Sequence, residues 1–247
     1  MERILFILGV LFSIVFSQNL YSQKRSHEFV VGNLQLKEEY NLGMVFSGVQ
    51  LEYRYGFLWE INNHEILYQP KLGAGIVFSR GMSALQLPKI VPVNATWTMR
   101  FFEQNGHTIK GGANLITDYS YQWYPYLHSG RLFWMSEIGI SPVVRYQYQW
   151  ETKRIGVYVQ NSLFGFTSHT QEYDPYWFSI MDNWIAEPHK NMKFGSYNTY
   201  NHTIVSFEFV PNTSKKYSFL YEFDYFGFFY GMKISRLNHN LVWRKAL

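Results

Sequence analysis

The chain has 247 residues, of which 20% are aromatic and 16% are charged, and its formal net charge is +4. Since a typical soluble domain carries roughly 25% charged residues, this balance favours a membrane or a sheet-rich environment. The mean hydropathy of −0.20 excludes a bundle of apolar transmembrane helices. The absence of cysteine excludes disulfides, thiolate metal sites and a lipid-modified N-terminal cysteine. Because the basic residues are scattered, nucleic acid is not an expected partner.

The N-terminus begins Met1-Glu2-Arg3 and continues with an apolar stretch at positions 4–16. A basic residue, a short apolar stretch and then small or polar residues are the order found in secretory signal peptides. We therefore predict a signal peptide over residues 1–22, cleaved after Ser17 or Ser22, and one domain over residues 23–247. An uncleaved anchor helix is the alternative, although the apolar stretch is short for a bilayer span.

Beyond residue 25 the dominant pattern is an alternation of apolar and polar residues with period two, which is typical of strands with two unlike faces. Val205, Phe207 and Phe209, for example, alternate with Ser206 and Glu208. Ten segments show the pattern: 27–36, 43–57, 64–79, 90–102, 107–118, 131–150, 153–167, 201–210, 217–230 and 236–246. A soluble β-sandwich would show the same alternation, so the lengths of the connections must distinguish a sandwich from a transmembrane barrel.

The connections alternate between short and long. Short links lie near 60–63, 103–106, 151–152 and 211–216, and longer links lie at 80–89, 119–130 and 168–200, with a smaller one near 231–235. Outer-membrane barrels have short periplasmic turns and long outer loops in this order. The sequence therefore predicts an all-β protein, a closed antiparallel transmembrane β-barrel of about ten strands in the outer membrane, with both termini periplasmic. Eight or twelve strands remain alternatives if a weak segment such as 27–36 or 236–246 was misjudged.

Aromatic residues mark the faces expected to contact lipid. Every odd position from Tyr217 to Tyr225 is aromatic, which would be a grossly aromatic core strand in a soluble domain. Trp134 and Tyr146 share one face of their segment and lie roughly 30 Å apart along the barrel axis. This spacing approximates the two aromatic girdles that flank the hydrocarbon layer.

Charged residues gather on the opposite faces, which would line the lumen. The predicted lumen charge network consists of Glu52, Arg54, Arg100, Lys110, Glu137, Arg145, Arg154, Glu208, Glu222 and Asp224, and Lys71 and Asp118 share the inward faces. A ten-stranded barrel is only slightly wider than the eight-stranded kind whose interior side chains fill. We therefore expect these charges to pair within a narrow lumen instead of lining an open pore.

The long connection 168–200 contains the strongest local feature. Asp174 and Pro175 suit a helix N-terminus and Pro188 discourages continuation, so we predict a short helix from Pro175 to Glu187. Its apolar residues recur at helical spacing. We expect this aromatic loop to plug the barrel mouth or to dock a partner protein, lipid or glycan, through Tyr173, Tyr176, Trp177, Met181 and Trp184.

Histidines near the predicted outer loops raise the alternative of a barrel hydrolase acting on lipid A or phospholipid. His128, His169, His189 and His202 lie on or beside these loops, with Ser129, Ser168 and Ser206 as candidate nucleophiles and Glu187 or Glu208 as the group that orients a base. His202 and Ser206 share a face but lie about 13 Å apart along a strand, so they cannot touch. We therefore name no catalytic residue, no metal ligand and no cofactor.

Two segments carry a resemblance to a known group of proteins. The segment Leu163-Phe164-Gly165-Phe166-Thr167-Ser168, followed by Tyr173 and Tyr176-Trp177, together with the closing segment 237–243, resembles uncharacterised outer-membrane barrels of diderm (Gram-negative) bacteria. The resemblance spans the C-terminal part of the chain. It implies a barrel located in the outer membrane and implies no specific activity. One departure is that many such proteins end in an aromatic residue, whereas this chain ends in Leu247.

These observations predict a non-enzymatic outer-membrane barrel with a narrow, charge-filled lumen. Its expected partners are outer-membrane lipid and lipopolysaccharide, and other envelope proteins at the aromatic loop. The rival interpretations are the barrel lipid hydrolase, with His202 as base and a loop serine as nucleophile, and a small passive pore suggested by the polar inward faces.

Overall fold

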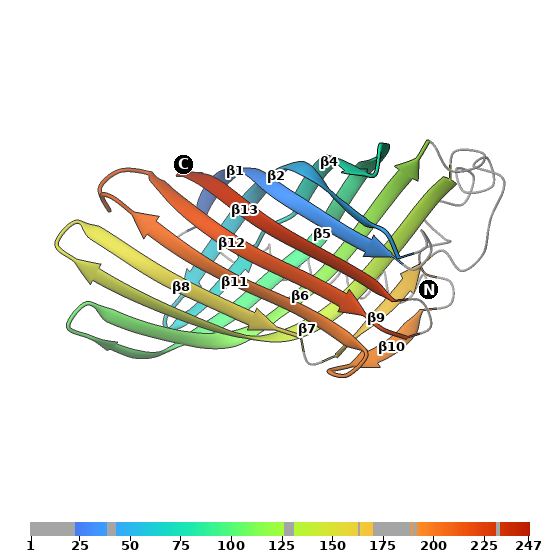
Figure 1. Cartoon of the computed structure of the whole chain (residues 1–247). Helices are drawn as coiled ribbons and strands as arrows, with labels where there is room; N and C mark the ends of the chain where they lie inside the picture. Colours follow the sequence, from blue (N-terminus) through green and yellow to red (C-terminus); the bar gives the residue numbers. More distant parts are fainter. Residues whose placement is uncertain are drawn as a thin grey trace.

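The alternating segments of the sequence form one antiparallel sheet that closes on itself (Figure 1). The computed structural model describes residues 23–38, 43–125, 131–162, 164–169, 189, 192–230 and 233–247. Its strands are β1 (Gln23–Glu38), β2 (Val45–Ile61), β3 (His64–Tyr68), β4 (Lys71–Ser79), β5 (Met82–Gln104), β6 (His107–Tyr124), β7 (Arg131–Trp150), β8 (Lys153–Asn161), β9 (Phe164–His169), β10 (Lys193–Ser196), β11 (Tyr200–Val210), β12 (Tyr217–Phe228) and β13 (Ile234–Ala246).

Three pairs of these segments lie end to end, so that thirteen segments make ten wall strands. β3 and β4 both pair with β2 and are separated at Pro70, which has no amide hydrogen for the ladder. β8 and β9 both pair with β7, and β10 and β11 continue beside them. Pairing of β1 with β13 closes the barrel. The predicted closed antiparallel barrel of ten strands is confirmed.

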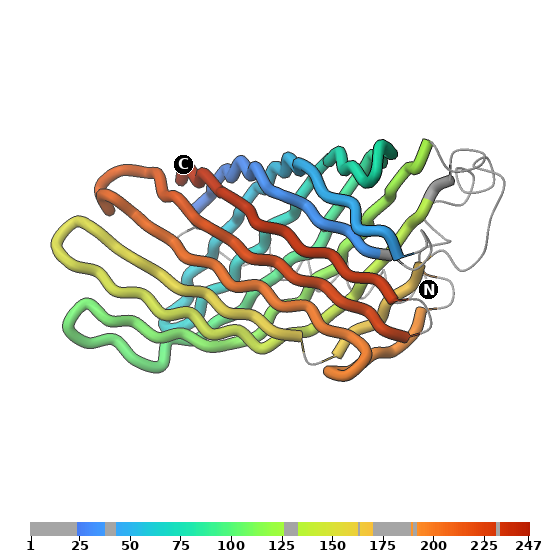
Figure 2. The backbone as a smooth tube through the Cα atoms, viewed as in Figure 1, coloured from blue at the N-terminus to red at the C-terminus, as the bar shows by residue number. Residues whose placement is uncertain are grey.

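Tight hairpins occupy one end of the barrel, as Figure 2 shows for the connections after β5, β7 and β11. Asn62, Asn105 and Glu151 have positive φ angles of 54°, 52° and 49° in the two-residue turns. Such turns match the right-handed twist of the flanking strands only when their central residues adopt positive φ. The C-terminal Leu247 donates its amide to the Arg25 carbonyl at 2.9 Å. Both described ends of the chain therefore lie at the hairpin end.

Connections at the other end differ from the predicted lengths. The expected link 80–89 is wrong, because Arg80 and Gly81 form a tight turn and β5 already begins at Met82. The predicted link 119–130 is also too long, since β6 extends to Tyr124. The start of β5 could not be predicted from the sequence, because the register between β5 and β6 shifts between Gln86 and Lys89. This shift interrupts the period-two alternation around Pro88.

The predicted link 168–200 is shorter than expected as well. β9 continues to His169, and β10 occupies Lys193–Ser196 before the turn at 197–199 leads into β11. The short helix predicted from Pro175 to Glu187 lies outside the described residues. Within the described ranges, no helix is long and apolar enough to cross a membrane.

A belt of exposed apolar side chains surrounds the wall, whereas the alternate positions point into the lumen. In β12, Phe219 is 49% exposed and its neighbour Leu220 is 8% exposed. The odd positions of this strand face outward, as the sequence predicts. Trp134 also lies on an outward face, yet it is buried against Tyr121 near the barrel end opposite the hairpins. Trp134 is therefore not exposed in the way that the predicted outer aromatic girdle requires.

The lumen is filled with apolar side chains at the end opposite the hairpins. Each of these residues lies near the strand end away from the hairpins, and none is more than 2% exposed: Leu34, Leu36, Phe46, Val77, Ala84, Tyr124, Phe133, Met135, Tyr200, Phe226, Phe228 and Ile234. We call this group the apolar layer. Below it the lumen is mostly polar, and a smaller apolar cluster of Val30, Leu220 and Val242 lies within this polar part.

Tyr200 of the apolar layer lies over a row of three glycines. Gly165 pairs with Gly139 on one side and with Gly195 on the other. A Cβ atom at Gly165 would lie 2.5 Å from Cζ of Tyr200, and one at Gly139 would lie 2.1 Å from its hydroxyl oxygen. Such separations are shorter than van der Waals contact, so the glycines are what lets the ring lie against the wall.

We predict that Gly165→Ala destabilises the folded barrel by about 1–3 kcal/mol, because the added methyl group overpacks the Tyr200 ring. Gly156→Ala is the matched control, since its Cβ would meet no atom closer than 3.5 Å. Urea unfolding of the refolded protein in lipid vesicles, followed by tryptophan fluorescence, measures both. Equal midpoints for the two variants would contradict the role assigned to the glycine row.

Candidate functional site

The polar part of the lumen is a network of charged side chains that reaches from the hairpin end to the apolar layer. At the hairpin end, Glu208 on β11 accepts hydrogen bonds from Arg244 on β13 at 2.6 Å and from Arg145 on β7 at 3.2 Å. Arg154 on β8 lies 3.7 Å from the same carboxylate. Arg244 also donates to Glu28 at 2.5 Å, so that it joins this cluster to the next one.

Arg54 on β2 organises the middle of the lumen. Its guanidinium donates two hydrogen bonds to Glu222 on β12, at 2.6 and 2.9 Å, and one to Glu52 at 2.6 Å. Glu28 lies 3.7 Å away, and Lys89 lies 3.3 Å from Glu52. Because β1 and β13 separate β2 from β12 in the sheet, the Arg54–Glu222 pair spans the space between distant parts of the wall.

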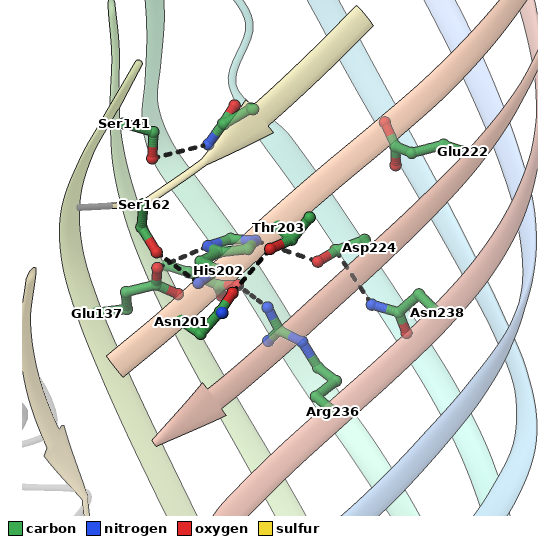
Figure 3. A network of polar contacts seen from close by, with 12 residues as sticks. Glu137, Ser141, Ser162, Asn201, His202, Thr203, Glu222, Asp224, Arg236 and Asn238 are labelled. Carbon is green, nitrogen blue, oxygen red and sulfur yellow. Dashed lines mark hydrogen bonds and ion pairs between the residues drawn. The ribbon is translucent and has the colours of Figure 1, made fainter. Parts of the chain in front are cut away.

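His202 on β11 lies beneath the apolar layer, between two carboxylates (Figure 3). Its Nδ1 is 2.6 Å from Oε1 of Glu137 on β7, and its Nε2 is 3.1 Å from Oδ1 of Asp224 on β12. The Tyr200 hydroxyl donates to the same Glu137 oxygen at 2.5 Å. Histidine donates from both ring nitrogens only when it is protonated. The geometry therefore suits an imidazolium cation paired with two anions.

An ion pair crosses the barrel at the same level. Arg236 on β13 donates to Asp118 on β6 at 2.8 Å, and these strands lie on opposite sides of the ten-stranded wall. Asn238, two residues along β13, donates to Asp224 at 3.2 Å and ties the pair to the His202 group (Figure 3). The lumen is thus bridged here by side chains from several strands.

The structure brings most of the predicted lumen residues together. Glu52, Arg54 and Glu222 form one group, Glu137 and Asp224 meet through His202, and Arg145, Arg154 and Glu208 form a third. Two predicted members lie apart from these groups: Lys110 pairs with Glu65, and Arg100 pairs with Glu103 close to the β5–β6 hairpin. The predicted loop residues Tyr173, Tyr176, Trp177, Met181 and Trp184 lie outside the described residues.

Sequence reasoning missed several charges that the structure buries wholly or in part, among them Glu28, Lys89, Arg236 and Arg244. The signal for three of them was present, because Glu28 alternates with outward Phe29, and Arg236 and Arg244 alternate with Leu237 and Trp243. Lys89 had no such signal, since it falls where the β5 register shifts.

His202 was expected at the outer rim as a candidate base, and the structure places it inside the lumen. It is 1% exposed, and the Phe226 ring packs edge-on against it at 5.9 Å. Both ring nitrogens face carboxylates, whereas Ser162 accepts a hydrogen bond from its backbone amide. A general base must contact the hydroxyl proton that it removes. This arrangement is that of an ion-paired core residue, and it does not present His202 to a serine or to a substrate.

Histidine and carboxylate side chains such as those in the lumen are also common metal ligands. Across the described ranges, no group of three or more histidine and carboxylate side chains is arranged to hold a metal ion. These charges neutralise one another, and each of the three groups around Arg54, His202 and Glu208 contains residues from at least two strands.

Comparisons with known proteins agree on the fold alone. No protein-family profile and no curated protein matches the sequence. The outer-membrane protease OmpT of Escherichia coli is similar in structure, with 9% identity, coverage of 93% of this chain and 99% of that chain, and a TM-score of 0.56. The translocator domain of the autotransporter NalP from Neisseria meningitidis has 6% identity, coverage of 94% and 91%, and a TM-score of 0.47. This chain is by fold a transmembrane β-barrel of the Gram-negative outer-membrane type.

We predict that His202→Leu costs about 3–5 kcal/mol of stability, because it leaves Glu137 and Asp224 buried without their cation. Removing both charges as well, in the triple variant His202→Leu, Glu137→Gln, Asp224→Asn, should recover most of this loss. Urea unfolding in lipid vesicles compares the wild type with the single and triple variants. If the triple variant is less stable than His202→Leu, the charge-neutralising role of His202 is wrong.

Proposed function

We propose that the protein is a non-enzymatic and non-conducting outer-membrane barrel, which holds its outer connections at the cell surface as a docking platform for a partner protein, a lipid or a glycan. The observation that carries the proposal is the filled lumen. Ion pairs such as Arg236–Asp118 bridge opposite sides of the wall, and the apolar layer occupies the end near the outer connections. A ten-stranded barrel is narrow enough for side chains to fill it.

This filling argues against the passive pore. An ion or solute in transit would have to separate pairs such as Arg54–Glu222, whose oxygens and nitrogens lie 2.6 and 2.9 Å apart. It would then have to enter the apolar layer, where a charged group loses its hydration without gaining a partner. Each step is costly, so the closed barrel is the state that the contacts support.

The docking role rests on the sequence of the connection between β9 and β10. Tyr176, Trp177, Met181 and Trp184 provide large amphipathic side chains in a segment that also contains Asp174 and Glu187. Tyrosine and tryptophan are enriched at recognition surfaces, because they bury a large area at a small cost in conformational entropy. In outer-membrane barrels of known structure, long connections at the outer end lie outside the bilayer, where partners can reach them.

We further propose that both termini face the periplasm and that the apolar belt contacts outer-membrane lipid and lipopolysaccharide. The support is that tight hairpins share one end with Leu247 and Arg25, and short turns are periplasmic in outer-membrane barrels. A membrane-impermeant maleimide should therefore label Arg80→Cys in intact cells and label Ser214→Cys only after lysis. The reverse pattern would invert the orientation.

We predict that the purified protein forms no ion channels in planar lipid bilayers, because the lumen is bridged and filled. A large porin serves as the positive control for insertion and recording. Reproducible conductance steps that scale with the amount of this protein would contradict the closed-barrel proposal.

Docking is tested by gentle extraction and mass spectrometry of whatever is bound in stoichiometric amounts. We expect the double variant Trp177→Ala, Trp184→Ala to lose the bound component, and Trp150→Ala at the hairpin end to retain it. Wild-type protein that is recovered alone, without lipid, glycan or protein attached, would reject the docking platform while leaving the closed barrel intact.

A further inference from the structure

Three polar side chains form a cluster on the outer face of the wall, which we call the amide cluster: Asn161 at the end of β8, and Asn201 and Thr203 at the start of β11. Asn161 Nδ2 donates to Thr203 Oγ1 at 2.7 Å and to Asn201 Oδ1 at 3.5 Å. The Thr203 hydroxyl donates to Asn201 Oδ1 at 2.7 Å. Asn161 follows the buried, inward-facing Gln160, and Asn201 and Thr203 flank the buried, inward-facing His202, so all three side chains point outward. Figure 3 labels Asn201, His202 and Thr203.

The amide cluster lies in the middle of the apolar belt. Towards the hairpin end, the outward residues of the same strands are exposed and apolar, as at Val159 and Phe207. Towards the outer connections they are also exposed and apolar, as at Phe164, Phe166 and Phe194. Polar side chains at this height therefore face the hydrocarbon of the bilayer, where no water is present to complete their hydrogen bonds.

Within the part of the chain that the structure describes, hydrogen bonding in the amide cluster leaves two polar groups without a partner. Asn161 uses its amide nitrogen and Thr203 uses its hydroxyl, so that Asn201 Oδ1 is satisfied. Among the described residues, no hydrogen bond is made by Asn201 Nδ2 or by Asn161 Oδ1. A free amide donor and a free amide acceptor thus lie side by side on adjacent strands. Leaving both in lipid is costly, and polar groups in this situation drive association of transmembrane segments.

We propose that this wall, formed by β8, β9, β10 and β11, is the contact face of a homodimer in the membrane. A two-fold axis parallel to the membrane normal, between two facing walls, places Asn201 Nδ2 of one copy against Asn161 Oδ1 of the second, and the reverse, so that the free donor and the free acceptor of each copy are both satisfied. A two-fold interface requires a self-complementary patch. Each copy has one free donor and one free acceptor, so the patch is complementary to itself. This complementarity favours a second copy over a partner of another kind. This inference does not depend on the docking role of the outer connections.

Aromatic side chains beside the amide cluster complete the contact face. The ring of Phe194 lies 5.4 Å from that of Phe166 and 6.3 Å from that of Phe164, and all three rings are exposed. They form a pad next to the polar centre. On the far side of the barrel, β4 presents Leu72, Ile76 and Phe78 without a polar residue among them. That wall offers only a lipid surface and provides the control.

The test uses the absence of cysteine from the chain, because a single introduced cysteine then reports one position. Val159→Cys lies two residues from Asn161 on the proposed face, and Leu72→Cys lies on β4. A short membrane-permeable bis-maleimide is applied to native membranes. We expect a dimer band for Val159→Cys at least tenfold stronger than for Leu72→Cys.

A second set of variants, in the Val159→Cys background, connects the dimer to the amide cluster. Asn161→Leu with Asn201→Leu should reduce the dimer band at least tenfold, whereas Asn33→Leu, at an exposed outward position of β1, should leave it unchanged. The heat-dependent gel shift of each variant reports that the barrel is folded.

Cross-linking that is equal at both cysteines, a dimer band that survives the double substitution in folded protein, or a cross-linked product of Val159→Cys with a different protein would each overturn the proposal. So would folded protein that gives no dimer band at all.

Discussion

Arg54, held by Glu222 and Glu52 at 2.6 Å each, shows the constraint on which the interior depends: a charge inside the barrel must be matched by charges from other strands. An unpaired ion at such a depth costs several kcal/mol, whereas a pair with good geometry roughly recovers the cost of desolvation. Because the partners come from strands that are distant in the sheet, the pairs can form only when the barrel has closed with the correct register.

The charged network and the apolar layer occupy different parts of the lumen and stabilise the barrel in different ways. The charges hold distant strands together, from Arg145 on β7 to Arg54 on β2. The apolar layer fills the end opposite the hairpins, and the glycine row lets Tyr200, one of its members, lie against the wall. His202 stands at the boundary between the two parts, packed against Phe226 and paired with Glu137 and Asp224. These contacts are those of a buried core residue, so His202 has a structural role in the lumen.

The outer face follows the opposite rule, and the amide cluster is one place among the described residues where this rule is broken. Hydrocarbon satisfies no hydrogen bond, so outward side chains at mid-height should be apolar, as Val159 and Phe207 are. Asn161, Asn201 and Thr203 depart from this where β8 gives way to β9 and β10 to β11. Departures of this kind occur where function constrains the sequence more strongly than stability does.

The sequence by itself determined the ten wall strands and the direction of most side chains, because the period of a strand is two and the lumen and the bilayer demand different residues. Glu52, Arg54 and Glu222 could be assigned to the lumen in this way. Only the tertiary structure decided which charges pair, that β5 begins at Met82, and that His202 is buried between two carboxylates. Which charged side chains pair depends on the register between strands that are far apart in the sequence. The alternation along one strand does not reveal that register.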